Sequence, residues 1–197
     1  MPFPDRSQED TVLWKHSPAY QLLHTTSERD KQKASSSGKP PTTWRKIWKL
    51  KAPSKIKHFC WKLYSDCLPN ASNLRKRGVL SQRGCPLCRA KEEDSTHTFQ
   101  RCPFTSETLT RQQLKSFPYQ FACMQDLVEF SFDNLEKDQL TKWVITMWDV
   151  WRQRNLALRE EPIRQPEETA TFALNFMSRM ANAAFVANQP FSIIENG

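Results

Sequence analysis

The stretch that decides the fold is residues 84–102, which read GCPLCRAKEEDSTHTFQRC and hold three cysteines and one histidine. The spacing is C-x2-C-x8-H-x4-C, and it runs from Cys85 and Cys88 through His97 to Cys102. Three thiolates and one imidazole are a standard ligand set for a structural zinc ion. We therefore predict one Zn2+ held by these four side chains, with no open coordination position for catalysis.

Local signals place each predicted ligand. Pro86 favours a tight turn that brings the thiols of the C-x-x-C pair to the same side. Asp94 is placed to cap a short helix that carries His97. Pro103 suits the first turn of the next helix, which puts Cys102 at the N-cap of that helix. The metal is thus expected to connect the C-x-x-C turn to the starts of the two helices that carry His97 and follow Cys102.

Two other interpretations of these cysteines stay open. The four residues can be buried thiols with a surface histidine, and no metal is then involved. A redox C-x-x-C pair is less favoured because no βαβ pattern surrounds it.

The first residues lack an apolar signal sequence, so we expect an intracellular, non-secreted protein, nuclear or cytoplasmic, whose thiols stay reduced.

The composition favours a helical fold. The chain has 197 residues and only four glycines, which argues against dinucleotide folds, phosphate loops and tight β-hairpins. Seven tryptophans and twelve phenylalanines supply large buried areas. No apolar run approaches the roughly 18 residues of a membrane span. We predict a mainly α, compact multi-helix domain stapled by the zinc site, with little or no β-sheet.

Apolar periodicity and turn signals divide the chain into five segments. The predicted order is a short helical segment over 1–25, a flexible linker over 26–41, the zinc-binding helical domain over 42–117, a helical extension over 118–188 and a tail over 189–197. Within the zinc domain, Ile56, Phe59, Cys60 and Leu63 recur at helical spacing and predict a core-facing stripe.

The extension is expected to contain helices over 124–130, 137–159 and 167–188. The last helix is expected to be amphipathic, with Phe172, Leu174, Phe176, Met177 and Met180 as its apolar residues. The tryptophans of the 137–159 helix are interpreted as packing residues rather than a base-stacking surface. Cys60, Cys67 and Cys123 are expected to be small buried residues.

Positive charge is concentrated before the cysteine stretch. Residues 42–83 contain eleven lysines or arginines and one acidic residue, although the whole chain carries only +8. Such a block favours phosphate-bearing partners; the alternative is an ordinary solvated surface. The predicted nucleic-acid-binding residues are Arg45, Lys46, Lys49, Lys51, Lys55, Lys57, Lys62, Arg75, Lys76, Arg77 and Arg83.

Several motifs in this region occur in a fixed order. They are Trp44-x2-Ile47-Trp48, then Ala52-Pro53-Ser54-Lys55-Ile56-Lys57-His58-Phe59-x-Trp61-Lys62-Leu63, then Leu68-Pro69-x3-Asn73-Leu74, and then the cysteine–histidine stretch. Together they resemble the zinc-binding domain that follows the reverse transcriptase in plant non-LTR (LINE-type) retroelements. A weaker similarity reaches Trp148-x2-Trp151-x2-Arg154-Asn155, which resembles the helix before the ribonuclease H domain of those polyproteins.

The resemblance implies a retroelement-derived, nucleic-acid-associated zinc module. The polymerase motif Tyr-x-Asp-Asp is absent from the sequence, and no nucleophile–base pair is visible. We interpret Glu92-Glu93-Asp94 as the solvated start of a helix, and we expect no enzyme. The leading hypothesis is low-specificity binding of RNA or DNA, with no membrane and no small-molecule substrate. The alternatives are a protein-interaction module that uses a helical surface with Trp44, Trp48 and Trp61, or an inert retroelement relic.

Overall fold

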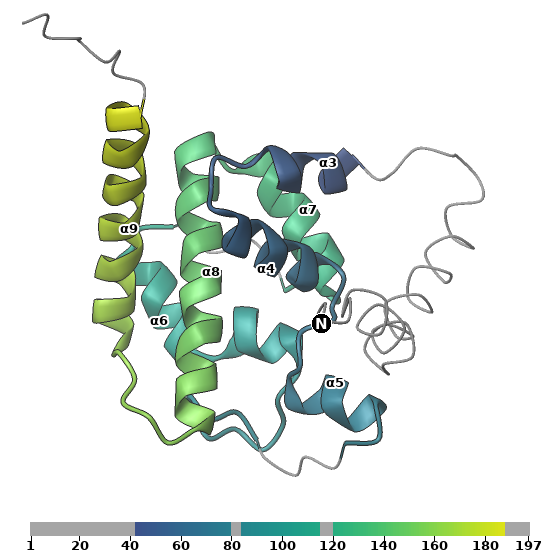
Figure 1. Ribbon diagram of the computed structural model, residues 1–197. Coiled ribbons are helices and arrows are strands. Elements are labelled where there is room, and N and C mark those ends of the chain that lie inside the picture. The colour runs from purple at the N-terminus through teal and green to yellow at the C-terminus, as the bar shows by residue number, and fades with distance from the viewer. Residues whose placement is uncertain (1–41, 80–83, 115–119, 188–197) are drawn as a thin grey trace, which may run out of the picture. The chain divides into compact units, whose positions relative to one another are not determined.

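The structure is a computed structural model that describes residues 42–79, 84–114 and 120–187 (Figure 1). The chain divides into the units Met1–Thr42 and Thr43–Gly197, and the described helices belong to the second. The predicted N-terminal segment, the linker, the tail and Arg83 lie outside the described residues. Every regular element within them is a helix, which confirms the mainly α prediction. The helices are α3 (Thr42–Lys49), α4 (Ser54–Tyr64), α5 (Ala71–Lys76), the π-helix η1 (His97–Arg101), α6 (Pro103–Arg111), α7 (Met124–Asn134), α8 (Lys137–Leu158) and α9 (Pro166–Ala187).

The start of α4 follows from Pro53, which occupies the N-cap position and interrupts the chain after α3. The predicted apolar stripe is confirmed, because Ile56, Phe59, Cys60 and Leu63 are all buried. They face α7 and α8, the two helices that α4 contacts most. The lysines of the same helix are left on its other sides.

The short helix α5 has a capping residue at its start and a glycine after its end. The side chain of Asn70 caps the N-terminus by accepting a hydrogen bond from the backbone N–H of Asn73 at 2.8 Å. After the C-cap Arg77, Gly78 adopts a φ of 75°, a left-handed conformation that glycine adopts without steric cost.

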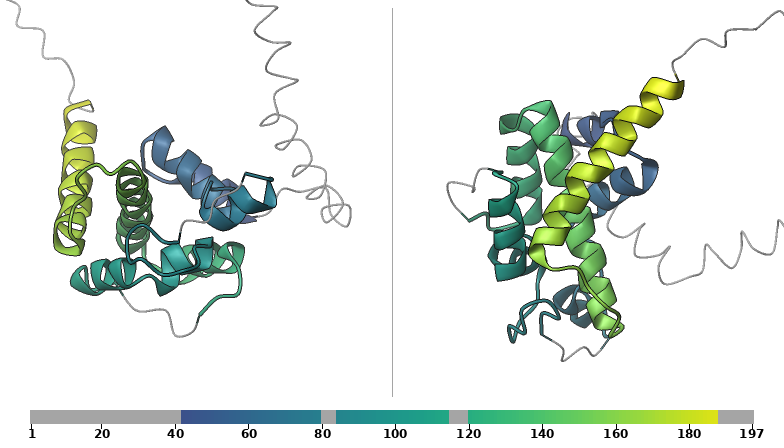
Figure 2. Two further views of the ribbon diagram at one scale, coloured as in Figure 1. Left: turned by 90° about the horizontal axis from the view of Figure 1, so that it is seen from below. Right: turned by 90° about the vertical axis from the view of Figure 1, so that its left-hand side faces the viewer.

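Helix α8 is the centre of the described unit. It packs against α9 on one side and α4 on the other, and Figure 2 shows it between those two helices. Trp143 and Trp151 are at most 9 % exposed, which confirms that tryptophans of this helix are packing residues. The main core therefore joins α4, η1, α7, α8 and α9, so the helices after residue 117 share one core with those before it.

Helix α9 corrects one prediction. Leu174 was counted with the apolar residues of an amphipathic helix, but it is 48 % exposed. The buried side of α9 is set by Ala170 and Ala173, whose small side chains allow close approach to α8 and α6. Position 174 is displaced by about 100° from Ala173 and points outward.

The end of α7 and the burial of the cysteines differ in detail from the predictions. Helix α6 ends at Arg111, ahead of Gln113, which has a φ of 54°. Helix α7 extends past the expected 130 to Asn134. Cys60 is buried and Cys67 half-buried, but the prediction for Cys123 was wrong, because this residue is exposed at the N-cap of α7.

A buried polar cluster closes the turn between α8 and α9. The Asp149 carboxylate is fully buried and accepts hydrogen bonds from Arg164 at 3.0 Å and from Gln153 at 3.3 Å. The Arg164 guanidinium also lies 4.2 Å from the centre of the Phe172 ring. These contacts tie the loop before α9 to the middle of α8. No helix among the described residues has the length and hydropathy of a membrane span.

Candidate metal centre

The turn that carries Cys85 and Cys88 is closed by two backbone hydrogen bonds. The N–H of Cys85 donates to the carbonyl of Ala90 at 2.9 Å, and the N–H of Arg89 donates to the carbonyl of Cys85 at 2.8 Å. Arg89 has a φ of 63°, which turns the chain back on itself directly after the second thiol. The result is a tight knuckle with both thiols on one side.

Gly84 lets the two ends of this knuckle meet. A Cβ atom at this position would lie 2.0 Å from the carbonyl oxygen of Ala90, which is far inside contact distance. The neighbouring atom belongs to the backbone and cannot rotate away. A side chain at position 84 is therefore incompatible with the hydrogen bond that closes the turn.

His97 and Cys102 are placed by the two predicted helix starts. Asp94 Oδ1 accepts a hydrogen bond from the backbone N–H of His97 and another from the hydroxyl of Thr96 at 2.7 Å, as a capping residue does. His97 then begins the π-helix η1. Cys102 occupies the N-cap of α6, with Pro103 directly after it, as predicted.

The four side chains converge on one point. One ligand atom from each of Cys85, Cys88, His97 and Cys102 lies within 4.8 Å of the other three. The Sγ atoms of Cys85 and Cys102 are 3.9 Å apart, and Cys88 Sγ is 3.2 Å from His97 Nε2. Thiolates bound at about 2.3 Å to one tetrahedral zinc lie roughly 3.8 Å apart. The donor set and its spacing therefore fit a tetrahedral ion.

The surroundings of the cluster are partly apolar. Cys85 and Cys102 are buried and pack with Phe104 and with Val150 of α8, while Cys88 and His97 are half-buried. This shell holds the sulfur atoms in place and limits their contact with water. Part of the apolar surface around the candidate ligands therefore comes from Val150 of α8, almost fifty positions after Cys102.

A hydrogen bond between two sulfur atoms shifts the pKa values of two of the cysteines in opposite directions. The hydrogen bond between Cys85 and Cys102, together with burial, raises the pKa of the Cys85 thiol, and the same hydrogen bond lowers the pKa of Cys102. Burial lowers the pKa of His97, which favours the neutral imidazole that coordinates metals. A bound metal would replace the shared proton and ionise the cysteines outright.

Glu93 overturns the interpretation of Glu92-Glu93-Asp94 as solvated. The side chain of Glu93 is 1 % exposed. Its Oε1 accepts a hydrogen bond from Arg154 Nε at 2.7 Å, and its Oε2 accepts one from Arg154 Nη2 at 2.5 Å. The same carboxylate accepts the backbone N–H of Ala71 at 3.0 Å. The stretch between the metal ligands is thereby fixed to both α8 and α5.

Sequence reasoning missed this ion pair because the partners are 61 positions apart. The available signal was the Arg154-Asn155 pair, which the family resemblance contains but which carried no assigned role. The Arg154 guanidinium also lies 4.8 Å from the centre of the Trp151 ring. Arg154 therefore supports the fold around the metal loop.

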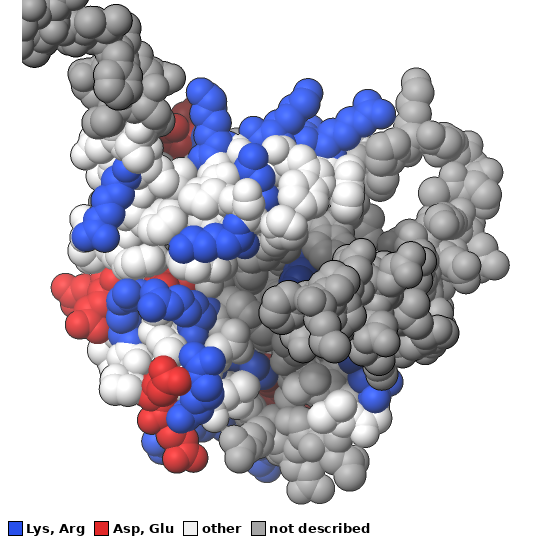
Figure 3. Space-filling view, in the orientation of Figure 1, with Lys and Arg blue, Asp and Glu red and all other residues white. Residues whose placement is uncertain are grey.

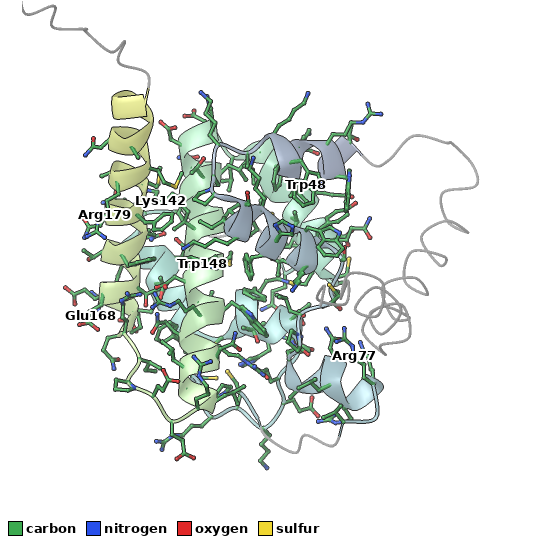
Figure 4. All side chains as sticks on the ribbon, in the orientation of Figure 1. Trp48, Arg77, Lys142, Trp148, Glu168 and Arg179 are labelled. Carbon is green, nitrogen blue, oxygen red and sulfur yellow. The ribbon has the colours of Figure 1, made fainter. Side chains whose placement is uncertain are left out.

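The predicted basic block separates into two groups. One group lies on α3 and α4 and in the turn between them, where Figure 3 shows lysine and arginine side chains along the upper edge. The other lies on and just after α5, and Figure 4 shows its Arg77 well away from Trp48 of α3. The first group is Arg45, Lys46, Lys49, Lys51, Lys55, Lys57 and Lys62; the second is Arg75, Lys76 and Arg77.

Some of these cations already have partners within the protein. Lys46 pairs with Asp133 of α7, and Lys57 donates to the backbone carbonyl of Trp48 at 3.0 Å. Lys55 Nζ lies 4.8 Å from the centre of the Trp148 ring and 5.5 Å from that of Phe176, so this side chain of α4 contacts both α8 and α9. Arg77 donates to the carbonyl of Cys67 at 3.1 Å. Among the described residues, Arg45, Lys49, Lys51, Lys62 and Arg75 have no ion-pair partner.

Three further cations lie on or beside the metal loop. Arg89 and Lys91 are exposed on the knuckle. Arg101 contacts both carboxylate oxygens of Asp94 at 3.1 Å, so it reinforces the residue that caps the His97 helix.

Together, the helical fold and the convergent Cys3His cluster define a helical domain with a candidate metal site whose donor set fits structural zinc. Residues 14–108 match the family model described as zinc-binding in reverse transcriptase. This stretch therefore matches a reverse transcriptase zinc-binding domain, which confirms the resemblance to that domain seen in the sequence. No curated protein and no solved structure matches the chain. The family match contains all four candidate ligands and ends before α7, α8 and α9 begin.

Proposed function

We propose that the chain is a structural-zinc module that binds RNA or DNA with low sequence specificity through basic residues of α3 and α4. The observation that carries this proposal is the set of exposed cations without an acidic partner in the described residues, Arg45, Lys49, Lys51 and Lys62. Neither α3 nor α4 contains an aspartate or glutamate. Cations of one sign on adjacent helices attract phosphates and release counterions on binding.

Zinc has a structural role in this proposal. Four protein ligands complete a tetrahedral shell and leave no position for a reactive water, so we propose no enzymatic activity. Cysteine ligands coordinate as thiolates, which suits a reducing intracellular compartment. The reverse transcriptase zinc-binding match further supports an origin in a retroelement polyprotein.

The α5 group is proposed as a second, smaller phosphate contact. Arg75 has no ion-pair partner in the described residues, and Lys76 is only 3.5 Å from a neutral amide oxygen of Asn73. Helix α5 is fixed to the metal loop through the backbone N–H of Ala71 and the Glu93 carboxylate. Metal binding would therefore hold this group in a defined position.

The test compares two variants that each lose three positive charges. The first is Lys49→Gln/Lys51→Gln/Lys62→Gln on the α3–α4 group. The matched control is Lys91→Gln/Arg159→Gln/Arg179→Gln, whose three exposed cations lie on the knuckle, after α8 and on α9. Binding of fluorescently labelled RNA and DNA is measured from about 50 to 200 mM salt, the interval over which phosphate contacts weaken strongly.

The proposal expects the α3–α4 variant to bind more weakly, with a salt slope reduced by about two to three. The control variant should retain the parental affinity and slope apart from a small uniform loss. Equal effects of the two variants would show that only net charge matters. Binding that is unchanged by salt would contradict a phosphate contact and favour a protein-docking surface instead.

A further inference from the structure

Three tryptophans form a cluster on α3 and α4. The ring centres of Trp44 and Trp48 are 5.6 Å apart at 68°, and those of Trp44 and Trp61 are 6.1 Å apart at 88°. His58 adds a fourth ring, 5.2 Å from Trp48. The three indoles are half-buried and His58 is exposed, so parts of the rings face solvent.

This cluster differs from the tryptophans of α8. Trp143 and Trp151 are buried in the main core, and Trp148 is covered by Lys55 and by phenylalanines of α9. Trp61 also packs against that core, but Trp44 and Trp48 do not belong to it among the described residues, and they contact the rings of Trp61 and His58. Packing of the core therefore leaves the two α3 indoles without a full structural explanation.

The charges beside the cluster define what it would bind. Arg45 follows Trp44, Lys49 follows Trp48 and Lys62 follows Trp61, so each indole has a cation next to it in sequence. None of the three cations has an ion-pair partner among the described residues, and α3 and α4 contain no acidic residue. The fitting ligand carries closely spaced negative charges and flat apolar groups in alternation.

We propose that the Trp44–Trp48–Trp61 cluster is a stacking site for unpaired bases, so that the chain prefers single-stranded nucleic acid to duplex. This inference rests on the proposed function and deepens it by naming the class of nucleic acid. Unpaired bases can stack on aromatic side chains while the adjacent cations contact the phosphates. A duplex offers the same phosphates but keeps its base faces stacked internally.

The test uses the zinc-loaded full chain and a fluorescently labelled oligothymidylate. The comparison ligand is a duplex with the same number of phosphates, and polyglutamate serves as a polyanion without bases. The variant Trp44→Leu/Trp48→Leu keeps apolar side chains on α3 and removes both rings. Lys49→Gln/Lys51→Gln, which removes charge and keeps the rings, is the matched comparison.

The parent should bind the single strand about tenfold more tightly than the duplex, since one stacked base contributes about that factor or more. The leucine variant should lose about tenfold for the single strand and nothing for the duplex. The glutamine variant should lose affinity for both. Thermal unfolding and zinc content show whether each variant folds.

A measurement on the parent protein alone keeps the proposal testable if the leucine variant does not fold. An oligomer with bromodeoxyuridine bases is photo-crosslinked to the protein, and the attachment sites are mapped by mass spectrometry. Attachment at Trp44 or Trp48 supports stacking. Attachment only at residues outside α3 and α4 overturns it.

The possible failures are distinguishable. Binding of single strand and duplex with equal affinity, and without an effect of the leucine substitutions, would overturn the stacking site and leave the phosphate contact standing. No binding of either nucleic acid at low salt would overturn the proposed function itself. Polyglutamate binding as strong as that of the oligomer and equally sensitive to loss of the indoles would assign the cluster to an acidic protein segment and overturn the base-stacking proposal.

Discussion

Arg154 of α8 and Glu93 of the metal loop form a buried, two-point ion pair across 61 positions of sequence. Their side chains are 3 % and 1 % exposed, so neither charge has water to replace its partner. The same Glu93 carboxylate reaches the first backbone N–H of α5. One contact therefore connects the metal loop to two helices.

Replacing Arg154 should destabilise the whole unit. The variant Arg154→Gln leaves the Glu93 charge buried without a cation, and breaking such a pair typically costs about 3–5 kcal/mol. Urea unfolding of the zinc-loaded protein measures the loss. The matched control is Arg159→Gln, whose exposed ion pair with Glu161 should contribute no more than about 1 kcal/mol. Equal losses in the two variants would contradict the role given to Arg154.

The zinc domain should need the helices that follow it. Phe99 of η1 packs against Trp151 at a ring distance of 6.2 Å, and Val150 packs beside Cys85 and Cys102. A fragment over residues 42–117 loses these partners and Arg154 as well. We expect it to show no cooperative thermal transition even with zinc, whereas a fragment over 42–187 should retain one. Thermal unfolding of both fragments is followed by circular dichroism. A cooperative transition in the shorter fragment would show that it is an independent domain.

Metal content should follow the four candidate ligands. We expect one zinc per chain by native mass spectrometry, and the helical signal should collapse when a chelator removes the ion, because zinc-finger-like sites gain on the order of 10 kcal/mol from metal. Cys85→Ser and Cys102→Ser should lose the ion. Cys123→Ser is the control, since that thiol is exposed at the start of α7. Full helicity and an unchanged melting curve after chelation would contradict a structural metal.

The Asp149 cluster should make stability depend on pH. Burial raises the pKa of the Asp149 carboxyl above its ordinary 3.8, against the opposing effects of Arg164, Gln153 and Arg152. Between 3.8 and the raised value the folded chain holds a proton that the unfolded chain has released, so the free energy of unfolding falls as pH rises.

The measurement subtracts the free energy of unfolding of Asp149→Asn from that of the parent in a series of urea titrations. The subtraction removes the titration of the metal ligands, which both proteins share. The difference should decline as pH rises from 3.8 and become constant above the raised pKa. A difference that increases with pH would show that the Arg164 ion pair outweighs burial.

Local signals predicted much of this structure. The apolar stripe of α4 and the caps at Asp94 and Cys102 follow from residues within a few positions of one another, and all are present. The four candidate ligands also lie within eighteen positions, so short-range turns suffice to bring them together.

The errors concern residues whose surroundings come from distant parts of the chain. Glu93 is an acidic residue in a charged run, and only Arg154 on another helix explains its burial. Leu174 fits an apolar stripe, but the alanines beside it set the contact with α8. The contacts of Lys55 with the rings of Trp148 and Phe176 were likewise not predicted, because those rings belong to α8 and α9. Periodicity and composition contain no information about such partners.

Gly84 has a consequence for how this site could be lost during evolution. A single methyl group there would collide with the backbone oxygen of Ala90 and open the turn that presents the first two thiols. A descendant with alanine at position 84 would keep every cysteine and the histidine, and its ligand signature would still be complete. Its knuckle would no longer close, so inheritance of the signature alone would not distinguish a working gene copy from a decayed one.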